Sequence, residues 1–458
     1  MFPDIGQKSP AYDNKRAVDR NPIVFFKLGH HCDRWRDEYT APSWCRCGAS
    51  GGDLKVRVTA IETVHVGAYP NITFVQVHTD EGLSGLGETF RTPWAVAAQI
   101  HETVAPYLLG KDPLAIDAHS DVLLNPYLGF GASSVEIRAA SAVDIALWDL
   151  LGKSVDRPVH ELLGGLTREK IRVYNTCAGY SYNQAGGTRR LVTAASGDAP
   201  AAGPYEDQIA FTRHPAELAQ SLLDMGITAM KIWPFDAFAI ASGGRDISTK
   251  DLKTGLEPFR KIRQAVGDGI DIMCEFHSLW NLPTAVRIGE ALAEYNVYWS
   301  EDPVKMVDLD VLADYRSRVR IPVCASETLA TRHAFRQLLA KHAVDYVMLD
   351  LGWCGGLSEA KKIAAMAEAS LRPIAPHDCT GPVVLIASLH LALNAPNALF
   401  QEVVRAYYTG WYKELVTELP RIERGEAYAM TGPGLGTALL PVLKQRPDVT
   451  VQRSVLST

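Results

Sequence analysis

The chain has 458 residues, too many for one ordinary domain, and 47% of them are hydrophobic against 21% charged, so it can bury a large core. It contains no stretch of about 18 uninterrupted apolar residues, which argues against a membrane span, and its composition argues against a disordered chain. The net charge of -6, without any run of lysine and arginine, offers no surface for nucleic acid and favours a small-molecule enzyme.

Residues 1–53 lack hydrophobic periodicity and are interpreted as an irregular N-terminal extension, either disordered or the product of a misassigned start. Five of the eight cysteines lie in or beside apolar runs and form no spaced disulfide framework, namely Cys177, Cys274, Cys324, Cys354 and Cys379. This cysteine usage and the lack of a secretory signal predict a cytoplasmic location.

Residues 54–167 are predicted to form an α+β domain. Polar and apolar residues alternate over 56–61 and 73–78, as in half-buried strands, and Asp80-Glu-Gly82 supplies the chemistry of a turn. Apolar residues then recur at helical spacing over 93–108 and 134–153.

Residues 168–402 contain eight short β-rich runs separated by helical stretches, which predicts parallel βα units closed into a TIM-like barrel. The runs are Arg172–Thr176, Thr228–Ile232, Asp271–Glu275, Val297–Glu301, Val323–Glu327, Asp345–Asp350, Pro373–His377 and Ala398–Glu402. Two connections on the catalytic face, 178–212 and 233–250, are long enough to be lids or substrate walls. The segment 403–458 is expected to pack back on the N-terminal α+β domain.

Ionisable residues end seven of the eight runs, where barrels keep their chemistry. They are Lys231, Glu275, Glu301, Glu327, Asp350, His377 and Glu402. Glu275, Glu301 and Glu327 are each 26 residues apart, about one βα unit, so their carboxylates are expected to converge at the barrel mouth. Because converging carboxylates repel unless a cation binds them, and oxygen-only ligation suits a hard ion, this pattern predicts a Mg²⁺ site.

The remaining strand-end residues predict acid–base chemistry beside this metal site. Asp350 can hold the far nitrogen of His377 and make that imidazole a general base. His277 follows Glu275 by two residues, so a continuing strand would aim both side chains to the same side, and His277 could then act as a general acid. Lys231 suits an enolate oxygen or a substrate carboxylate, and Glu402 could hydrogen-bond the same group.

With these residues in place, the chain resembles the enolase superfamily, in its mandelate racemase and acid-sugar dehydratase branch, over residues 54–440. The matching motifs are Ala146-Leu-Trp-Asp149, Lys231, Glu275, Glu301-Asp-Pro303, Glu327, Asp350 before Gly355-Gly356, Ala375-Pro-His377 and Glu402. The resemblance implies a modified (β/α)7β barrel under an N-terminal α+β capping domain completed by the C-terminal segment, one Mg²⁺ ion, and removal of the proton α to a substrate carboxylate. It also implies that Glu275, Glu301 and Glu327 are the metal ligands.

Further roles are carried over by the resemblance. His377 and Asp350 would form the catalytic dyad, and His277 resembles the acid that protonates the departing 3-hydroxyl in galactonate-dehydratase-like members. Arg91, in a loop over the barrel mouth, is a candidate for contact with a distal substrate group. Two positions depart from the family pattern: Glu275 stands where an aspartate is usual, and Lys231-Ile-Trp233 lacks the second lysine of Lys-x-Lys.

The missing lysine favours a dehydratase of a sugar acid, an aldonate or aldarate, because dehydration needs one base whereas racemisation needs two. The product would be a 2-keto-3-deoxy acid, and the enzyme a carbon–oxygen lyase. Two alternatives stay open: a racemase or epimerase of a 2-hydroxy acid on the same scaffold, and a non-catalytic protein that binds acid sugars. A small-molecule carboxylate is the expected partner, and the family resemblance suggests a homo-oligomer.

Overall fold

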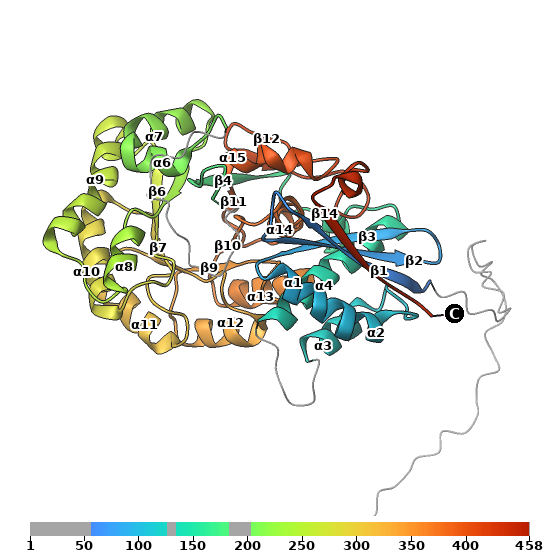
Figure 1. Ribbon diagram of the computed structural model, residues 1–458. Coiled ribbons are helices and arrows are strands. Elements are labelled where there is room, and N and C mark those ends of the chain that lie inside the picture. The colour runs from blue at the N-terminus through green and yellow to red at the C-terminus, as the bar shows by residue number, and fades with distance from the viewer. Residues whose placement is uncertain (1–55, 126–133, 183–202, 458) are drawn as a thin grey trace, which may run out of the picture. The chain divides into compact units, whose positions relative to one another are not determined.

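The structure is a computed structural model and describes residues 56–125, 134–182 and 203–457 (Figure 1). The N-terminal extension predicted for residues 1–53 lies outside these described residues. Among the helices that the structure describes, none is long and apolar enough to cross a membrane.

A four-stranded antiparallel sheet with helices on it forms the N-terminal half, and its strand order is β14-β1-β2-β3. The chain order is β1 (Val58–Val66), β2 (Ile72–Thr79), β3 (Ser84–Phe90), α1 (Pro93–Gln99), the π-helical turn η1 (Ile100–Val104), α2 (Ala105–Leu108), α3 (Ile116–Leu124), α4 (Val135–Ser154) and α5 (Val159–Leu162). Helix α4 lies directly on β3 because glycines leave room for it: a Cβ at Gly87 would stand 1.8 Å from the carbonyl oxygen of Ala142.

Eight parallel strands form the second half, and they close into a barrel. They are β4 (Lys170–Thr176), β5 (Ala229–Ile232), β6 (Asp271–Glu275), β7 (Trp299–Glu301), β8 (Val323–Ala325), β9 (Tyr346–Leu349), β10 (Ile374–Pro376) and β11 (Gln401–Val403). Each of the first six pairs with the next, β11 pairs with β4, and a bridge between Ile374 and Ala398 joins β10 to the segment that leads into β11. The predicted modified TIM barrel is therefore confirmed.

Helices surround the barrel strands (Figure 1). They are α6 (Asp207–Arg213), α7 (Pro215–Asp224), α8 (Asp236–Ser242), α9 (Thr249–Val266), α10 (Leu282–Leu292) with the 3₁₀ turn η2 (Ala293–Tyr295), α11 (Leu309–Arg318), α12 (Thr331–Ala340), α13 (Gly356–Ala369), α14 (Pro382–Asn394) and α15 (Arg405–Tyr408). The two long connections predicted as loops each contain a helix in their described part, α6 in the first and α8 in the second.

The C-terminal segment returns to the N-terminal sheet, as the fold class predicts. After the 3₁₀ turn η3 (Trp411–Glu414), strands β12 (Ile422–Glu423) and β13 (Glu426–Tyr428) form a hairpin that extends the barrel sheet beside β4. A further 3₁₀ turn, η4 (Leu443–Gln445), precedes β14 (Val449–Val455), which pairs antiparallel with β1. The indole of Trp411 also stacks on Tyr69, with 4.5 Å between ring centroids.

One buried carboxylate ties three parts of the chain together. Asp149 of α4 is fully buried and accepts hydrogen bonds from the backbone N–H of Leu86 at 2.7 Å, the N–H of Leu435 at 2.8 Å and Lys153 Nζ at 2.6 Å. It therefore joins β3, α4 and the C-terminal segment, which explains the Asp149 of the sequence motif as a structural residue.

We predict that D149A destabilises the fold by about 3–5 kcal/mol, because it leaves a lysine and two buried N–H groups without their acceptor. The free energy of unfolding in urea measures this. D121A, a change of the same type on the exposed surface of α3, should stay within about 0.5 kcal/mol of the wild type. If D149A lowered the free energy of unfolding as little as D121A does, the structural role of Asp149 would be contradicted.

Candidate active site

A cavity of about 210 Å³ lies at the carboxyl ends of the barrel strands, under residues from the N-terminal half. Most of the residues singled out from the sequence line it, namely Arg91, Lys231, Glu275, His277, Glu327, His377 and Glu402; Phe90, Thr176, Tyr182, Trp233, Thr328, Trp353 and Cys379 complete the wall. Glu301 and Asp350 do not line it, but each bonds a residue that does.

The three predicted metal ligands follow neighbouring strands. Glu275 ends β6 opposite Glu301, which ends β7, and Glu327 comes two residues after β8. Burial raises the pKa of Glu301 well above its ordinary value, and the neighbouring charge of Glu275 raises it further. One oxygen of Glu327, Oε2, is buried without a hydrogen-bond partner among the residues that the structure describes. The carboxylates are thus close enough to repel one another, as the sequence predicts.

A fourth carboxylate, Asp302, was missed by the sequence reasoning although it directly follows Glu301. It is 1% exposed; its Oδ2 accepts a hydrogen bond from Ser326 at 2.7 Å, whereas its Oδ1 is buried and has no partner in the described part of the chain. Burial raises the pKa of Asp302 well above its ordinary value, and the charges of Glu327 and Glu275 add to this. Its strand-end position was the signal that could have revealed it.

This donor set fits a hard divalent cation in its chemistry. It offers only carboxylate oxygens, and two of them, Glu327 Oε2 and Asp302 Oδ1, are buried with no hydrogen-bond partner among the described residues. Among the residues that the structure describes, no three acidic, histidine or cysteine side chains already form a metal cage. Glu275 already uses one of its oxygens within the protein, because its Oε1 accepts hydrogen bonds from the N–H groups of Phe276 and His277. Metal binding would therefore need side-chain rotation.

Lys231 is the cation that faces these carboxylates. Its Nζ donates a hydrogen bond to Glu301, forms an ion pair with Glu402 at 3.1 Å, and lies 3.5 Å from Glu275. Burial lowers the pKa of Lys231, but these carboxylates raise it more, so the amine is protonated. Its contact with a substrate oxygen stays a prediction, since the ammonium is engaged by protein carboxylates in the structure.

Glu402 is saturated by donors. Its Oε1 accepts a hydrogen bond from Thr176 and forms an ion pair with Lys231, and its Oε2 accepts from the Tyr174 hydroxyl at 2.8 Å and the N–H of Asp378 at 3.0 Å. Burial raises the pKa of Glu402, but Lys231 and His377 lower it more. The carboxylate is therefore ionised and held firmly, and its predicted contact with substrate also stays a prediction.

His377 and Asp350 lie together as the sequence predicts. His377 Nδ1 is 2.7 Å from Asp350 Oδ2, and Asp350 Oδ1 accepts the N–H of Gly352, also at 2.7 Å. The contact with Asp350 uses Nδ1 of His377 and therefore leaves the other ring nitrogen, Nε2, out of this pair. Burial lowers the pKa of His377, but the charges of Glu402, Asp350 and Glu327 raise it to about 10.

His277 reaches the cavity in a different way from the one predicted. The strand β6 ends at Glu275, so no strand alternation carries His277; it has a left-handed backbone, with φ of 49°. Its ring is held by side chains instead: Nδ1 is 2.8 Å from Asp236 Oδ2, and Nε2 is 3.4 Å from the hydroxyl of Tyr182. Burial lowers the pKa of His277, but Asp236 and Glu275 raise it to about 9.

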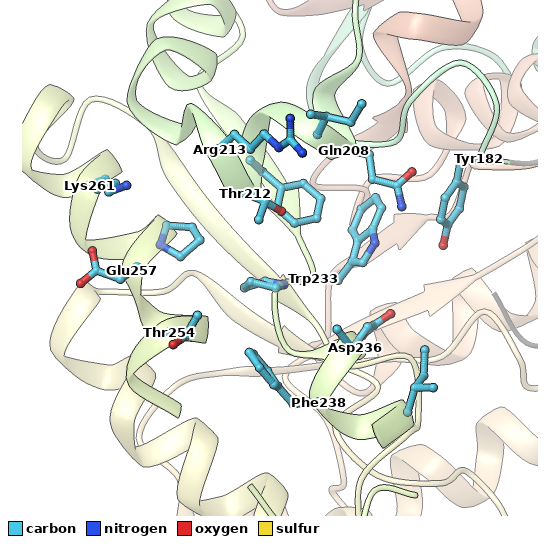
Figure 2. Close-up of a pocket in the computed structure, with 16 residues that line it drawn as sticks. Tyr182, Gln208, Thr212, Arg213, Trp233, Asp236, Phe238, Thr254, Glu257 and Lys261 are labelled. Atoms are coloured by element: carbon cyan, nitrogen blue, oxygen red, sulfur yellow. The ribbon is translucent and has the colours of Figure 1, made fainter. Parts of the chain in front are cut away.

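Asp236 was missed because it stands in the connection after β5, one turn beyond Trp233, where no strand-end rule applies. A second cavity, of about 490 Å³, lies between α6, α8 and α9, and Figure 2 shows Tyr182, Trp233 and Asp236 among its labelled lining residues. Tyr182 and Trp233 also line the smaller cavity. They therefore form a wall with a space on either side.

Two arginines come from the N-terminal half. Arg91 lines the cavity, with its guanidinium 5.2 Å from the centroid of the Phe90 ring. Arg138, which the sequence reasoning did not single out, lies 4.8 Å from the centroid of Trp353, and burial lowers its pKa while the charge of Asp350 raises it. Arg91 therefore lines the cavity from the N-terminal side, and Arg138 contacts a residue of the cavity wall, Trp353.

Comparisons with known proteins agree with this architecture. Residues 54–164 match the model of the mandelate racemase / muconate lactonizing enzyme N-terminal domain, and residues 214–441 match that of the enolase C-terminal domain-like family. A D-xylonate dehydratase of Haloferax volcanii is 30% identical over 397 residues, which cover 85% of this chain and 88% of the relative. A D-galactonate dehydratase of Pectobacterium atrosepticum is 28% identical over 394 residues, covering 84% and 92%.

Solved structures are similar as well. An enolase protein from the environmental genome sequencing of the Sargasso Sea is 49% identical with a TM-score of 0.78, covering 88% of this chain and all of that one. An enolase of the mandelate racemase subgroup from Agrobacterium tumefaciens is 48% identical with a TM-score of 0.77, covering 87% and 99%.

We predict that the metal-free protein loses stability as the pH rises from 6.5 towards 10. The folded-state pKa of His377, about 10, is above the ordinary value of 6.5, so its stabilisation is complete below pH 6.5 and is lost as the pH passes through about 10. H377N should reduce this pH-dependent fall in the free energy of unfolding by on the order of 1–3 kcal/mol. Urea unfolding in EDTA at each pH measures it. Replacing an exposed histidine, H333N, should leave the curve unchanged. Parallel curves for H377N and wild type would refute this prediction.

Proposed function

The chain belongs to the mandelate racemase / muconate lactonizing enzyme family of the enolase superfamily, and on that premise we propose that it is a Mg²⁺-dependent dehydratase of a sugar acid. The observation that carries the proposal is the pair of histidines at the cavity, each bound through Nδ1 to its own carboxylate. The names of the relatives, which dehydrate xylonate, arabinonate and galactonate, support the same reaction class, a hydro-lyase.

The two histidines approach from opposite sides of the barrel. His277 follows β6 and His377 follows β10, four strands apart in a ring of eight. A substrate between them has one imidazole on each face. This suits an elimination in which one ring takes a proton from C2 and the other gives a proton to the hydroxyl leaving C3.

His377 is the proposed base, because Asp350 holds its Nδ1 and leaves Nε2 for the proton at C2. As that proton leaves, negative charge develops on the substrate carboxylate. Glu275, Glu301 and Glu327 would hold the Mg²⁺ ion, which supplies Lewis-acid stabilisation of this charge when bound. The ammonium of Lys231 adds positive charge at the same place, either directly or through the carboxylates that it bonds.

His277 is the proposed acid. The C2–C3 double bond forms as the C3–O bond breaks, the oxygen leaves with its electron pair, and the proton of His277 completes a water molecule. The enol product then ketonises to the 2-keto-3-deoxy acid. Arg91, at the cap side of the cavity, is proposed to bind a distal group of the sugar acid.

We predict that the full chain with Mg²⁺ in D₂O converts one or more members of a panel of aldonic and aldaric acids, seen by proton NMR as new 3-deoxy methylene signals. EDTA should stop the reaction, and H377N should lower it by about 10³-fold or more because the base is lost. H333N is the control for a histidine replacement. Loss of the α proton signal without methylene signals would instead favour the epimerase, and binding without any exchange would favour a non-catalytic acid-sugar binder.

We predict a different result for H277N. Since this ring serves only the second proton transfer, H277N should lower dehydration by about 10²-fold or more and keep exchange of the α proton with solvent within about threefold of wild type. The same NMR spectra measure both rates. Equal loss of exchange and dehydration would remove the acid role from His277.

A further inference from the structure

We propose that Asp236 is a positioning residue for the acid step: it holds the His277 ring with Nε2 toward the cavity, so that the chain dehydrates its substrate rather than only exchanging the α proton. This proposal rests on the proposed function. It concerns a residue at the start of α8, outside the strand ends that supply the other site residues.

The contacts of the two histidines are alike. His377 Nδ1 lies 2.7 Å from Asp350 Oδ2, and His277 Nδ1 lies 2.8 Å from Asp236 Oδ2. A carboxylate can only accept at this contact, so Nδ1 carries the hydrogen in both rings and Nε2 is left to work at the cavity. The site thus contains two imidazole–carboxylate pairs, one on each side.

His277 depends on such a partner more than His377 does. Its backbone and that of Ser278 are both left-handed, with φ of 49° and 56°, so the His277 side chain projects from a loop that follows the end of the strand. The strand therefore does not set the direction of the ring. The backbone N–H of His277 is fixed by Glu275 at 2.6 Å, but this contact leaves the side-chain torsions open.

Aromatic side chains complete the support without supplying a second hydrogen-bond acceptor for Nδ1. Trp233 meets the His277 ring edge-on, with 5.6 Å between centroids, and packs against Tyr182 at 5.4 Å. The Tyr182 hydroxyl is on the Nε2 side of the ring. Asp236 is then the contact that distinguishes Nδ1 from Nε2, and loss of it would let the ring flip.

Asp236 itself is well placed for this task. It is 9% exposed, and its Oδ1 is buried without a partner among the described residues, so the carboxylate keeps its bonding capacity for the histidine. It lies between the two cavities next to the active site, of about 490 and 440 Å³. Figure 2 labels it on the lining of the larger one.

The step it serves is a proton transfer that balances within the site. The proton on Nε2 of His277 moves to the 3-hydroxyl oxygen, the C3–O electron pair leaves with that oxygen as water, and the electrons of the former C2–H bond become the C2–C3 double bond. His277 ends neutral, and its Nδ1–H remains bonded to Asp236. If the ring is turned, the deprotonated substrate regains a solvent-derived proton at C2 instead.

The test compares wild type, D236N, H277N and the double variant D236N/H277N in D₂O with Mg²⁺ and the substrate found in the acid panel. We expect D236N to lower dehydration by about 10²-fold while α-proton exchange stays within about threefold of wild type. The double variant should be no slower than H277N alone, because Asp236 acts only through that ring. D246N, an exposed aspartate ten residues further along, is the matched control and should behave as wild type.

Four results would count against the proposal. D236N could dehydrate at the wild-type rate, or it could lose exchange and dehydration equally at an unchanged unfolding free energy, which is the signature of a general structural role. Should D236N unfold, D236E replaces it: the longer carboxylate keeps an acceptor for Nδ1, so partial return of dehydration supports the proposal and no return opposes it. A wild-type chain that neither exchanges nor dehydrates any acid would overturn the dehydratase assignment, and the role of Asp236 with it.

Discussion

The rest of the site depends on one constraint, the burial of many carboxylates beside few cations. Glu275, Glu301, Asp302 and Glu402 are all nearly inaccessible to water, and three of them, Glu275, Glu301 and Glu402, lie around the ammonium of Lys231. Buried charges of one sign repel strongly unless protons or cations balance them. Lys231 supplies part of that balance, the two imidazoles add to it when they are protonated, and a divalent cation is the group best able to supply the remainder. The same charge excess makes the histidines basic.

The barrel can hold these buried charges because the side chains that stabilise it lie in a different place from the charged ones. The interior below the site is filled by apolar and aromatic side chains such as Tyr174, Trp299 and Phe400, which pack on one another edge to face. Those side chains fix the strand ends, and the strand ends fix the carboxylates. Packing elsewhere in the barrel therefore helps to offset the electrostatic cost that the contacts within the site leave.

The sequence predicts the residues whose position follows from a strand, and it fails where position follows from something else. Apolar runs that end on Glu275, Glu301 or His377 locate the barrel and its mouth, since the carboxyl ends of parallel strands face the same way. Asp236 could not be found in this way, because it begins a helix inside a long connection. The orientation of His277 was predicted by strand alternation that stops two residues earlier, although the residue itself reaches the cavity.

The junction with the N-terminal half explains how the cap can influence chemistry that resides in the barrel. Glu88, at the end of β3, accepts the N–H groups of Val383 and Val384 in the first turn of α14, and the Thr89 hydroxyl donates to the carbonyl of Gly352. The first turn of α14 comes after β10 and His377, and Gly352 comes after β9 and Asp350. The next residues on β3 and its loop, Phe90 and Arg91, face the substrate cavity. The proposed contact of Arg91 with substrate and the alignment of the proposed base, His377, are thus joined by four consecutive residues, so a change of specificity in this loop must preserve the anchor formed by Glu88 and Thr89.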